Sequence, residues 1–425
     1  MKIQPAGAVV GAVAVPGDKS VSHRAVMLGA IGEGDTVVEN FGRSADTEAT
    51  VGAMRALGTP IGEGGDRLVV SGNGLRGLRE PDGPIDCMNA GTLMRLLAGI
   101  LAGQDGRYEL VGDESLSQRP MGRVAEPLKQ MGAKVELDPP EHPMVIEGGD
   151  LEPIAYELPV ASGQVKSAVL LAGLYANGTT TVVEPVATRD HTELMLQAAG
   201  AKVVRRARSV SIEPPAELRL GTIEVPGDFS SAAPFIVAAT LLEGSELFVQ
   251  GVGLNPTRTG FLSVLGRMGA RVTVFNKRRS GGELIGDLEV RSAQLVATTV
   301  TAEEVPSMVD ELPLFALAAA MARGDSLVRG AAELRVKETD RIEAVVDGLK
   351  RLGAHIEALE DGMKIRGVPT RLRGGTMESR GDHRIAMLGA VAGLVSRDGV
   401  EIEGAEAVTV SFPGFFDLLD SVAQR

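Results

Sequence analysis

The sequence contains few of the residues that redox, metal and base-stacking chemistry require. Its 425 residues include one cysteine, Cys87, no tryptophan, three tyrosines and five histidines. A single cysteine allows neither an internal disulfide nor a cysteine-based zinc site, and the histidines lack metal-ligand spacing, so we expect no metal and no cofactor. The scarcity of aromatic residues also disfavours stacking platforms for single-stranded nucleic acid.

Long hydrophobic runs are missing as well. The longest two, 312–322 and 385–395, have 11 residues each, whereas a membrane-spanning helix needs ~20. The N-terminus lacks the continuous apolar stretch and the small-residue cleavage site of a signal peptide. Because one cysteine also fits a reducing compartment, the sequence predicts a cytoplasmic protein with no membrane partner.

The chain has no excess of positive charge, since 43 Lys and Arg face 56 Asp and Glu and the net charge is −13. This balance disfavours non-specific nucleic-acid binding, so an anionic ligand has to be held by a local cluster of Lys and Arg. With 44% hydrophobic and 23% charged residues, the composition is typical of a folded protein rather than a disordered or fibrous one. The length predicts more than one domain.

What the sequence does contain is an internal repeat. Six segments rich in alanine and leucine each begin at a polar turn, and we expect each to form a helix with a left-handed C-terminal cap at its last glycine. A strand-like run follows each helix, and then comes a second helix, which in five of the six repeats ends at a residue pair closed by glycine. The first helices are expected at 20–34, 91–103, 162–178, 228–244, 311–324 and 382–399. The closing pairs are Leu57-Gly58, Met131-Gly132, Ala199-Gly200, Met268-Gly269 and Leu352-Gly353.

A second symmetry divides the chain in two. The motif VPGD at 15–18 recurs at 225–228, three repeats later, and we interpret the two copies as crossovers between two similar α/β domains. A cleft between two like domains is a common place for a small-molecule site. The predicted domains are 18–225, and 1–17 together with 226–425, with hinges near 16–18 and 225–228.

The first helix start carries charges that a plain helix cap does not need. In PGDKSVSHR at 16–24, a glycine turn leads into a helix with Lys19, Ser20 and Arg24 in its first turns, and exposed backbone N–H groups there favour an anion. The alternative interpretation is that an acidic or hydroxyl side chain here is only an N-cap. The matching helix start at Asp228 has no Lys or Arg, which favours a functional role for the cations.

Other helix starts repeat this pattern with different polar residues. For the segments NAGTLMR, SQRPMGR and ASGQVK, a plain N-cap or a surface arginine is the competing interpretation. In RVKETDR, Lys337 and Arg341 are four residues apart and are expected on one helical face. Asp310, Arg189 and Arg384 also lie at helix starts.

Two further motifs match known signatures only in part, because the helix or the residues that should accompany them are missing. The glycines of 72–77 fit a dinucleotide-binding pattern, but Pro81 and Pro84 interrupt the helix that such a site needs, so this segment is expected to be a loop. The run His191-Thr192-Glu193 is similar to the start of a zinc deaminase signature, yet the paired cysteines that complete the signature are missing.

Six motifs occur along the chain in the order PGDKSVSHR, NAGTLMR, QRPMGR, ASGQVKSA, RVKETDR and GDHRIAM. Together they resemble the motifs of the 3-phosphoshikimate 1-carboxyvinyltransferase (EPSP synthase) family of enolpyruvyl transferases. The resemblance covers essentially the whole chain. It implies two domains, each of three βαβαββ units in an inside-out α/β barrel, with an interdomain active-site cleft.

The implied activity is transfer of the enolpyruvyl group of phosphoenolpyruvate to the 5-hydroxyl of shikimate 3-phosphate, with release of phosphate, through a tetrahedral adduct. This reaction belongs to the shikimate pathway to chorismate and the aromatic amino acids. The two small molecules are then the ligands, and we expect a monomer.

The resemblance also implies the site residues. Shikimate 3-phosphate would be bound by Lys19, Ser20, Arg24, Ser162, Gln164, Arg189, Asp310 and Lys337. Phosphoenolpyruvate would be bound by Lys19, Gly91, Arg119, Gln164, Arg341 and Arg384. Asp310 would accept the proton of the 5-hydroxyl, while Glu338 and Lys19 would handle protonation of the methylene carbon and the departing phosphate. The division of roles among these three residues stays open.

The chain departs from the family pattern near its C-terminus. Many members carry a Lys two residues before a Phe-Pro pair, where this chain has Val410, so one phosphoenolpyruvate contact is either missing or supplied elsewhere. The segments around Ser162 and 188–193 resemble a subclass with glyphosate-tolerant members, whereas Gly91 keeps the small residue that leaves room for this inhibitor. Sensitivity and tolerance to glyphosate both stay open.

The sequence has two alternative interpretations. The sister family that acts on UDP-N-acetylglucosamine, UDP-N-acetylglucosamine 1-carboxyvinyltransferase, carries a reactive Cys in a mobile loop and an N-terminal Lys-Asn motif, whereas Cys87 here lies just before a helix start and the N-terminal motif is Asp-Lys-Ser. A non-catalytic repeat scaffold predicts similar residues in every repeat, whereas the charged residues here differ between repeats.

Overall fold

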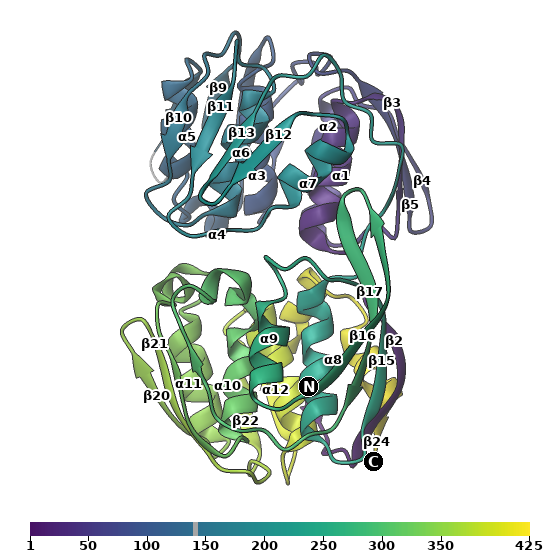
Figure 1. The fold of residues 1–425 in the computed structure, drawn as a ribbon, viewed down its shortest axis with the longest axis vertical. Coiled ribbons are helices and arrows are strands. Elements are labelled where there is room, and N and C mark those ends of the chain that lie inside the picture. The colour runs from purple at the N-terminus through teal and green to yellow at the C-terminus, as the bar shows by residue number, and fades with distance from the viewer. Residues whose placement is uncertain (139–142) are drawn as a thin grey trace. The chain divides into compact units, whose positions relative to one another are not determined.

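The computed structural model describes residues 1–138 and 143–425, and the chain forms two compact units (Figure 1). The N-terminal unit consists of Gly17–Pro226 and the short segment Arg279–Glu283. The C-terminal unit consists of Met1–Pro16, Gly227–Arg278 and Leu284–Arg425. The predicted division kept 226–425 in one domain. It differs from the structure at 279–283, because this segment is the tip of a long hairpin and packs with the N-terminal unit.

The helices follow the repeat pattern of the sequence. In the N-terminal unit they are α1 (Lys19–Ala30), α2 (Ala45–Ala56), α3 (Gly91–Leu101), α4 (Glu114–Ser117), α5 (Gly122–Gln130), α6 (Gly163–Gly173) and α7 (His191–Ala198). In the C-terminal unit they are α8 (Phe229–Leu241), α9 (Gly260–Arg267), α10 (Leu312–Ala320), α11 (Arg341–Arg351), α12 (His383–Val395) and α13 (Phe415–Val422). The short 3-10 helices η1 (Val305–Ser307), η2 (Val309–Glu311), η3 (Ala332–Val336) and η4 (Ala405–Val410) also lie in the C-terminal unit.

Each repeat of the N-terminal unit builds a four-stranded sheet of the same order. The strands are β3 (Glu33–Glu39), β4 (Ile61–Gly64), β5 (Arg67–Asn73), β6 (Ile85–Asp86), β7 (Arg107–Val111), β8 (Lys134–Leu137), β9 (Met144–Glu147), β10 (Ala155–Glu157), β11 (Thr180–Val183), β12 (Val203–Arg206), β13 (Ser209–Ile212) and β14 (Thr222–Glu224). The sheet orders are β14–β3–β5–β4, β6–β7–β9–β8 and β10–β11–β13–β12. In each sheet the first pair is parallel and the following pairs are antiparallel.

The C-terminal unit varies this plan. Its strands are β1 (Lys2–Ile3), β2 (Ala8–Ala14), β15 (Glu246–Gly253), β16 (Arg271–Ser280), β17 (Glu283–Arg291), β18 (Thr299–Val300), β19 (Gly324–Val328), β20 (His355–Leu359), β21 (Gly362–Gly367), β22 (Gly375–Glu378), β23 (Val400–Glu403) and β24 (Ala423–Gln424). The order β18–β19–β21–β20 matches the other unit, while β16–β17–β15–β2–β24 gains a fifth strand. The last repeat has only the parallel pair β22–β23, with β1 added antiparallel to β23.

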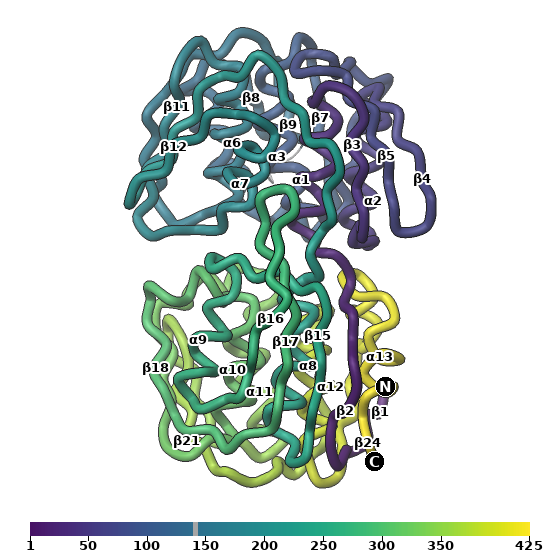
Figure 2. The backbone as a smooth tube through the Cα atoms, turned by 45° about the vertical axis from the view of Figure 1, so that its right-hand side comes forward, coloured from purple at the N-terminus to yellow at the C-terminus, as the bar shows by residue number. Residues whose placement is uncertain are grey.

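The units exchange their first strands at the crossovers. β2 precedes α1 in the chain but pairs in parallel with β15 of the C-terminal unit, whereas β14 precedes α8 but pairs in parallel with β3. Both chain termini lie in the C-terminal unit, where β24 pairs with β2 (Figure 2). The repeated VPGD motif is therefore the point at which the chain leaves one unit for the other.

The first helix of each repeat lies in the interior of its unit. Nearly every residue of α8, α10 and α12 is buried, and these helices pack against one another, as expected for helices that are apolar on all faces. In the N-terminal unit α3 packs closely on α6, because a Cβ at Gly99 would lie only 2.2 Å from the Ala168 carbonyl oxygen. The helices form the core and the sheets lie around them, which confirms the predicted α/β class.

The predicted helix ends were right for the second helices and wrong for five of the six first ones. α2, α5, α7, α9 and α11 end as predicted, with glycines 58, 132, 200, 269 and 353 just beyond the C-cap at φ between 88° and 102°. Five of the first helices end earlier, with C-caps at Ile31, Leu174, Leu242, Met321 and Ser396. The exception is α3, whose C-cap Ala102 directly precedes Gly103 as predicted, although Gly103 does not have the left-handed φ that was expected. Glycines 34, 178, 244, 324 and 399 do have positive φ, but they lie in the turn or at the start of the next strand. These glycines reverse the chain direction rather than cap a helix.

Among residues 1–138 and 143–425, no helix combines the length and the apolar character needed to cross a bilayer.

We expect Gly99→Val to lower the thermal unfolding midpoint, because the new side chain must push α3 away from α6, at a cost of about 1–3 kcal/mol. The matched control is Gly52→Ala in α2, since no described heavy atom lies within 4 Å of a Cβ built there. The control should melt at or slightly above the wild-type temperature, because alanine favours a helix interior. A Gly99→Val protein as stable as the control contradicts the close packing of α3 on α6.

Candidate active site

The start of α1 carries the first group of predicted ligand-binding residues. Asp18 is the N-cap, and its carboxylate accepts the backbone N–H of Val21 at 2.9 Å, so capping and charge occur together here. Lys19 Nζ lies 2.8 Å from Asp46 Oδ2. Burial raises the pKa of Asp46, but the Lys19 ammonium more than offsets this and holds the pKa below its ordinary value. The Lys19 ammonium is thus held in place by a fixed counter-charge.

Arg24 is a buried cation, with 4% of its surface exposed. Its guanidinium donates to the Thr192 hydroxyl at 2.7 Å, the Ser20 carbonyl at 2.9 Å and the Ser167 hydroxyl at 3.0 Å. Burial lowers the pKa of Arg24 to about 10, so the side chain stays charged at neutral pH. The charge of Arg189 also acts to lower this pKa.

The plain side-chain N-cap that the sequence allowed as the competing interpretation of NAGTLMR is not formed. The N-cap of α3 is Ala90, and no side chain in the described part of the chain caps this helix. Thr92 Oγ1 instead accepts a hydrogen bond from Gln164 Nε2 at 2.9 Å, and Asn89 Oδ1 accepts one from Arg119 Nη2 at 2.7 Å. These two side chains are hydrogen-bonded to predicted ligand-binding residues, so neither of them caps the start of α3.

Close approaches connect the remaining residues of this unit. A Cβ at Gly91 would lie 3.3 Å from Arg119 Nη1, and a Cβ at Gly163 would lie 3.4 Å from Arg189 Cβ. Ser162 caps α6, and its side chain accepts the backbone N–H of residue 165. The structure therefore gathers Lys19, Ser20, Arg24, Gly91, Arg119, Ser162, Gln164 and Arg189 at the starts of α1, α3 and α6 and just before α5 and α7.

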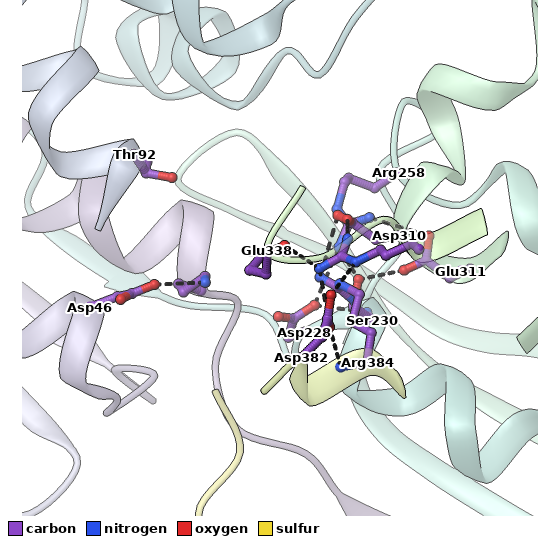
Figure 3. Close-up of polar contacts among 12 residues, drawn as sticks. Asp46, Thr92, Asp228, Ser230, Arg258, Asp310, Glu311, Glu338, Asp382 and Arg384 are labelled. Carbon is purple, nitrogen blue, oxygen red and sulfur yellow. Dashed lines mark hydrogen bonds and ion pairs between the residues drawn. The ribbon is translucent and has the colours of Figure 1, made fainter. Parts of the chain in front are cut away.

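In the C-terminal unit the site is built around Arg341, which is 1% exposed. Its Nε donates to Asp382 at 2.7 Å, its Nη2 to Glu338 at 2.5 Å and its Nη1 to Asp310 at 3.3 Å. Arg384 Nη2 lies 3.4 Å from the other oxygen of Asp310, and the carboxylates and Arg384 converge in Figure 3. Burial alone would lower the pKa of Arg341, but these three carboxylates raise it above its ordinary value.

Lys337 and Arg341 do not share a helical face, contrary to the prediction. Lys337 follows η3 in an extended conformation, and α11 starts only at Arg341. The physical reason is the cap, since the Asp340 side chain accepts the backbone N–H of Glu343 at 3.1 Å and so fixes where the helix begins. Burial lowers the pKa of Lys337 below its ordinary value.

A second buried ion cluster holds the segment that carries Asp310. The next residue, Glu311, accepts a hydrogen bond from the Ser230 hydroxyl and lies 3.5 Å from Arg258 Nη1 (Figure 3). Arg258 also donates to the Ser230 hydroxyl at 2.5 Å and lies 3.4 Å from Asp228, the N-cap of α8. Asp310 is therefore anchored through its neighbour to α8 as well as through its own contacts to two arginines.

Sequence reasoning missed the carboxylates that hold these cations. Asp382 lies inside a motif that was singled out, GDHR, but its role as the counter-charge of Arg341 was not predicted. Asp46 gives no signal in the sequence, because it lies 27 residues from Lys19 and only folding brings the two together.

Cys87 is buried and Val410 is exposed, and each bears on an expectation from the sequence. Cys87 is fully buried, and burial raises the pKa of its thiol, so the reactive thiolate is disfavoured. Val410 ends η4 and is 42% exposed. A buried, protonated thiol does not fit the reactive cysteine of the UDP-N-acetylglucosamine alternative.

The fold is that of the enolpyruvyl transferases. The chain aligns with the enolpyruvyl transferase NikO from Streptomyces tendae at a TM-score of 0.80 and 18% identity, over 99% of this chain and 96% of that one. An EPSP synthase structure from Acinetobacter baumannii aligns at a TM-score of 0.91 and 44% identity, over 99% of this chain and 98% of that one.

The sequence comparison is more specific. Residues 3–419 match the profile of the EPSP synthase (3-phosphoshikimate 1-carboxyvinyltransferase) family. Proteins named 3-phosphoshikimate 1-carboxyvinyltransferase from Citrifermentans bemidjiense and Desulforudis audaxviator are 48% and 50% identical to this chain, covering 100% and 99% of it and 99% of each relative. The chain therefore belongs to the EPSP synthase family.

We expect Asp46→Asn to destabilise the protein by about 1 kcal/mol at pH 7, because Lys19 loses a charged hydrogen-bond partner. Folding lowers the pKa of Asp46 below its ordinary value of 3.8. The contribution of its charge to folding stability is therefore complete above pH 3.8 and disappears as the pH falls through the lowered pKa. Thermal midpoints of the wild type and the variant, measured between pH 7 and pH 3, should therefore converge at the acid end.

The control is Glu147→Gln, which removes one partner of the exposed pair with Lys134. This change should leave stability within about 0.5 kcal/mol of wild type. A difference between Asp46→Asn and wild type that is the same at every pH contradicts the charge argument.

Proposed function

We propose that the residues gathered at the helix starts of each unit serve the reaction of this family. The chain transfers the enolpyruvyl group of phosphoenolpyruvate to the 5-hydroxyl of shikimate 3-phosphate and releases phosphate, a step of the shikimate pathway to chorismate and the aromatic amino acids. The observation that carries the proposal is the set of cations at helix starts in a chain of net charge −13. The two substrates together bring two phosphates and two carboxylates, which match these cations.

Shikimate 3-phosphate is assigned to one set of side chains and phosphoenolpyruvate to an overlapping one. The first set is Lys19, Ser20, Arg24, Ser162, Gln164, Arg189, Asp310 and Lys337. The second set is Lys19, Gly91, Arg119, Gln164, Arg341 and Arg384. The close approach between Gly91 and Arg119 supports a role for the bare start of α3 beside an anion.

The contacts of Asp310 support its assignment as the base. Its two oxygens lie 3.3 Å from Arg341 Nη1 and 3.4 Å from Arg384 Nη2, the two arginines of this unit that are assigned to phosphoenolpyruvate. The carboxylate is therefore adjacent to the groups that would bind one substrate, as a base that acts on the acceptor hydroxyl requires.

The reaction requires two proton transfers at carbon. The 5-hydroxyl oxygen bonds to C2 of phosphoenolpyruvate while Asp310 takes its proton, and C3 receives a proton, which gives the tetrahedral adduct. The C2–O bond to phosphate then breaks, and C3 loses a proton to restore the double bond. We assign the proton transfers at C3 and at the departing phosphate to Glu338 and Lys19.

The remaining expectations follow from the sequence. A cytoplasmic location, a monomeric state and the absence of nucleic-acid or membrane partners stay predictions. The role of Val410 in place of the usual Lys also stays a prediction, since its exposed side chain offers no charge to a substrate.

The first test is phosphate release by the purified protein with phosphoenolpyruvate and either shikimate 3-phosphate or UDP-N-acetylglucosamine. We expect release only with shikimate 3-phosphate. Asp310→Asn should lower kcat about a hundredfold or more, because the base is lost, while the affinity for shikimate 3-phosphate changes much less.

Asp325→Asn is the matched control, because Asp325 is an exposed aspartate on β19. This control should keep wild-type turnover. Near-normal turnover by Asp310→Asn overturns the assignment of the base.

A thiol reagent gives an independent test of the alternative acceptor. Because Cys87 is buried and its pKa is raised, iodoacetamide should neither label the native protein nor inhibit it at pH 8, while the unfolded protein should be labelled. Mass spectrometry and phosphate release read out the two effects. Rapid labelling of the native chain with loss of activity would favour a reactive cysteine.

A further inference from the structure

The first turn of α7 joins three different parts of the fold. His191 Nδ1 lies 2.7 Å from Glu283 Oε1, and each side chain is 2% exposed. Thr192 accepts from Arg24 and donates to the Ser167 hydroxyl, both at 2.7 Å. The run His191-Thr192-Glu193, which is similar to a zinc signature in the sequence, is thus a junction of buried contacts.

The third residue of this run completes the junction. Glu193 lies 2.7 Å from Lys166 Nζ, and Lys166 also lies 3.0 Å from Glu184. Burial raises the pKa of Glu193 even though Lys166 opposes this. The start of α7 is therefore held by Lys166 of α6, which also pairs with Glu184 just after β11. A further charge at this helix start, Glu283, comes from far along the chain.

Glu283 belongs to the tip of the β16–β17 hairpin (Figure 2). The two strands start and end in the C-terminal unit, but the tip, Arg279–Glu283, packs with the N-terminal unit. The Ser280 hydroxyl accepts the backbone N–H of Glu224 at 2.8 Å. Gly282 has φ +87°, and a Cβ there would lie 2.5 Å from the Leu194 carbonyl oxygen of α7. Glycine at the tip is thus required for the approach that brings Glu283 to His191.

The charge of Glu283 acts on one predicted substrate-binding cation, Arg24. Burial lowers the pKa of Arg24, while Glu193, Asp18 and Glu283 each act to raise it. Arg189, two residues before His191, acts on Arg24 in the opposite direction. Glu283 therefore lies within electrostatic reach of a cation that the proposed function assigns to shikimate 3-phosphate.

We propose that Glu283 is a positioning residue for shikimate 3-phosphate binding. From the hairpin tip it accepts the Nδ1 proton of His191 and fixes the start of α7, and with it the segment that carries Arg189. It also supports the charge of Arg24. A hairpin that served only to extend its sheet would need neither a buried carboxylate nor a glycine fitted against α7. The inference rests on the proposed roles of Arg24 and Arg189.

The test is calorimetric titration of the full-length protein with shikimate 3-phosphate, together with steady-state phosphate release. Glu283→Ala should weaken shikimate 3-phosphate binding about tenfold, because the start of α7 loses its anchor. The KM for phosphoenolpyruvate should stay within about twofold and kcat at saturating shikimate 3-phosphate within about threefold, since the reacting groups are untouched. Glu283→Gln keeps a hydrogen-bond acceptor for His191 without the charge and should show an intermediate loss.

Lys277→Ala, an exposed change on the same hairpin, is the control and should bind as wild type. Unchanged binding by Glu283→Ala, or a loss that falls equally on both substrates, overturns the proposal. If Glu283→Ala fails to fold, Glu283→Gln decides, because wild-type affinity in that variant also overturns it. Failure of the wild-type protein to bind shikimate 3-phosphate would instead overturn the proposed function.

Discussion

Burying Arg341 requires the chain to surround it with carboxylates. A guanidinium does not lose its proton in a protein, so an interior arginine must be paired and hydrogen-bonded. Asp382 at the start of α12, Glu338 before α11 and Asp310 in η2 meet this requirement together. Satisfying one buried charge therefore fixes three side chains from two repeats, and two of these, Asp310 and Glu338, are the carboxylates to which proton transfers are assigned. Removing one partner of such a cluster costs more than the intact cluster contributes.

The requirement that a buried cation be paired and hydrogen-bonded also explains side-chain positions in the N-terminal unit. Arg24 and Lys166 are buried cations, and each is held by acidic or hydroxyl groups brought by other elements. The negative net charge of the chain and its cationic helix starts are consistent, because many of the acids serve as counter-charges that hold cations in place. Glu283 extends this arrangement, since a carboxylate from a distant hairpin completes the set around α7.

The repeat architecture places these groups without imposing identical chemistry. In the C-terminal unit the interior helices α8, α10 and α12 are apolar on nearly all faces beyond their first turn, so their starts are where side chains can vary without disturbing the core. Asp228 and Asp18 begin equivalent helices and both act as caps, yet one is followed by Lys19 and the other by Phe229. A common scaffold thus carries different residues in each repeat.

The sequence by itself determined the helices, the strands, the repeat and the glycines that follow the second helices, because these depend on periodicities of 3.6 and 2 and on local backbone preferences. It also carried the motifs of the site. Only the tertiary structure decided the pairing of Lys19 with Asp46 and of Arg341 with Asp382, which are 27 and 41 residues apart. The contact of Glu283 with His191, 92 residues apart in the chain, was decided there too. Buried charges choose partners by proximity in space, and proximity arises only when the chain has folded.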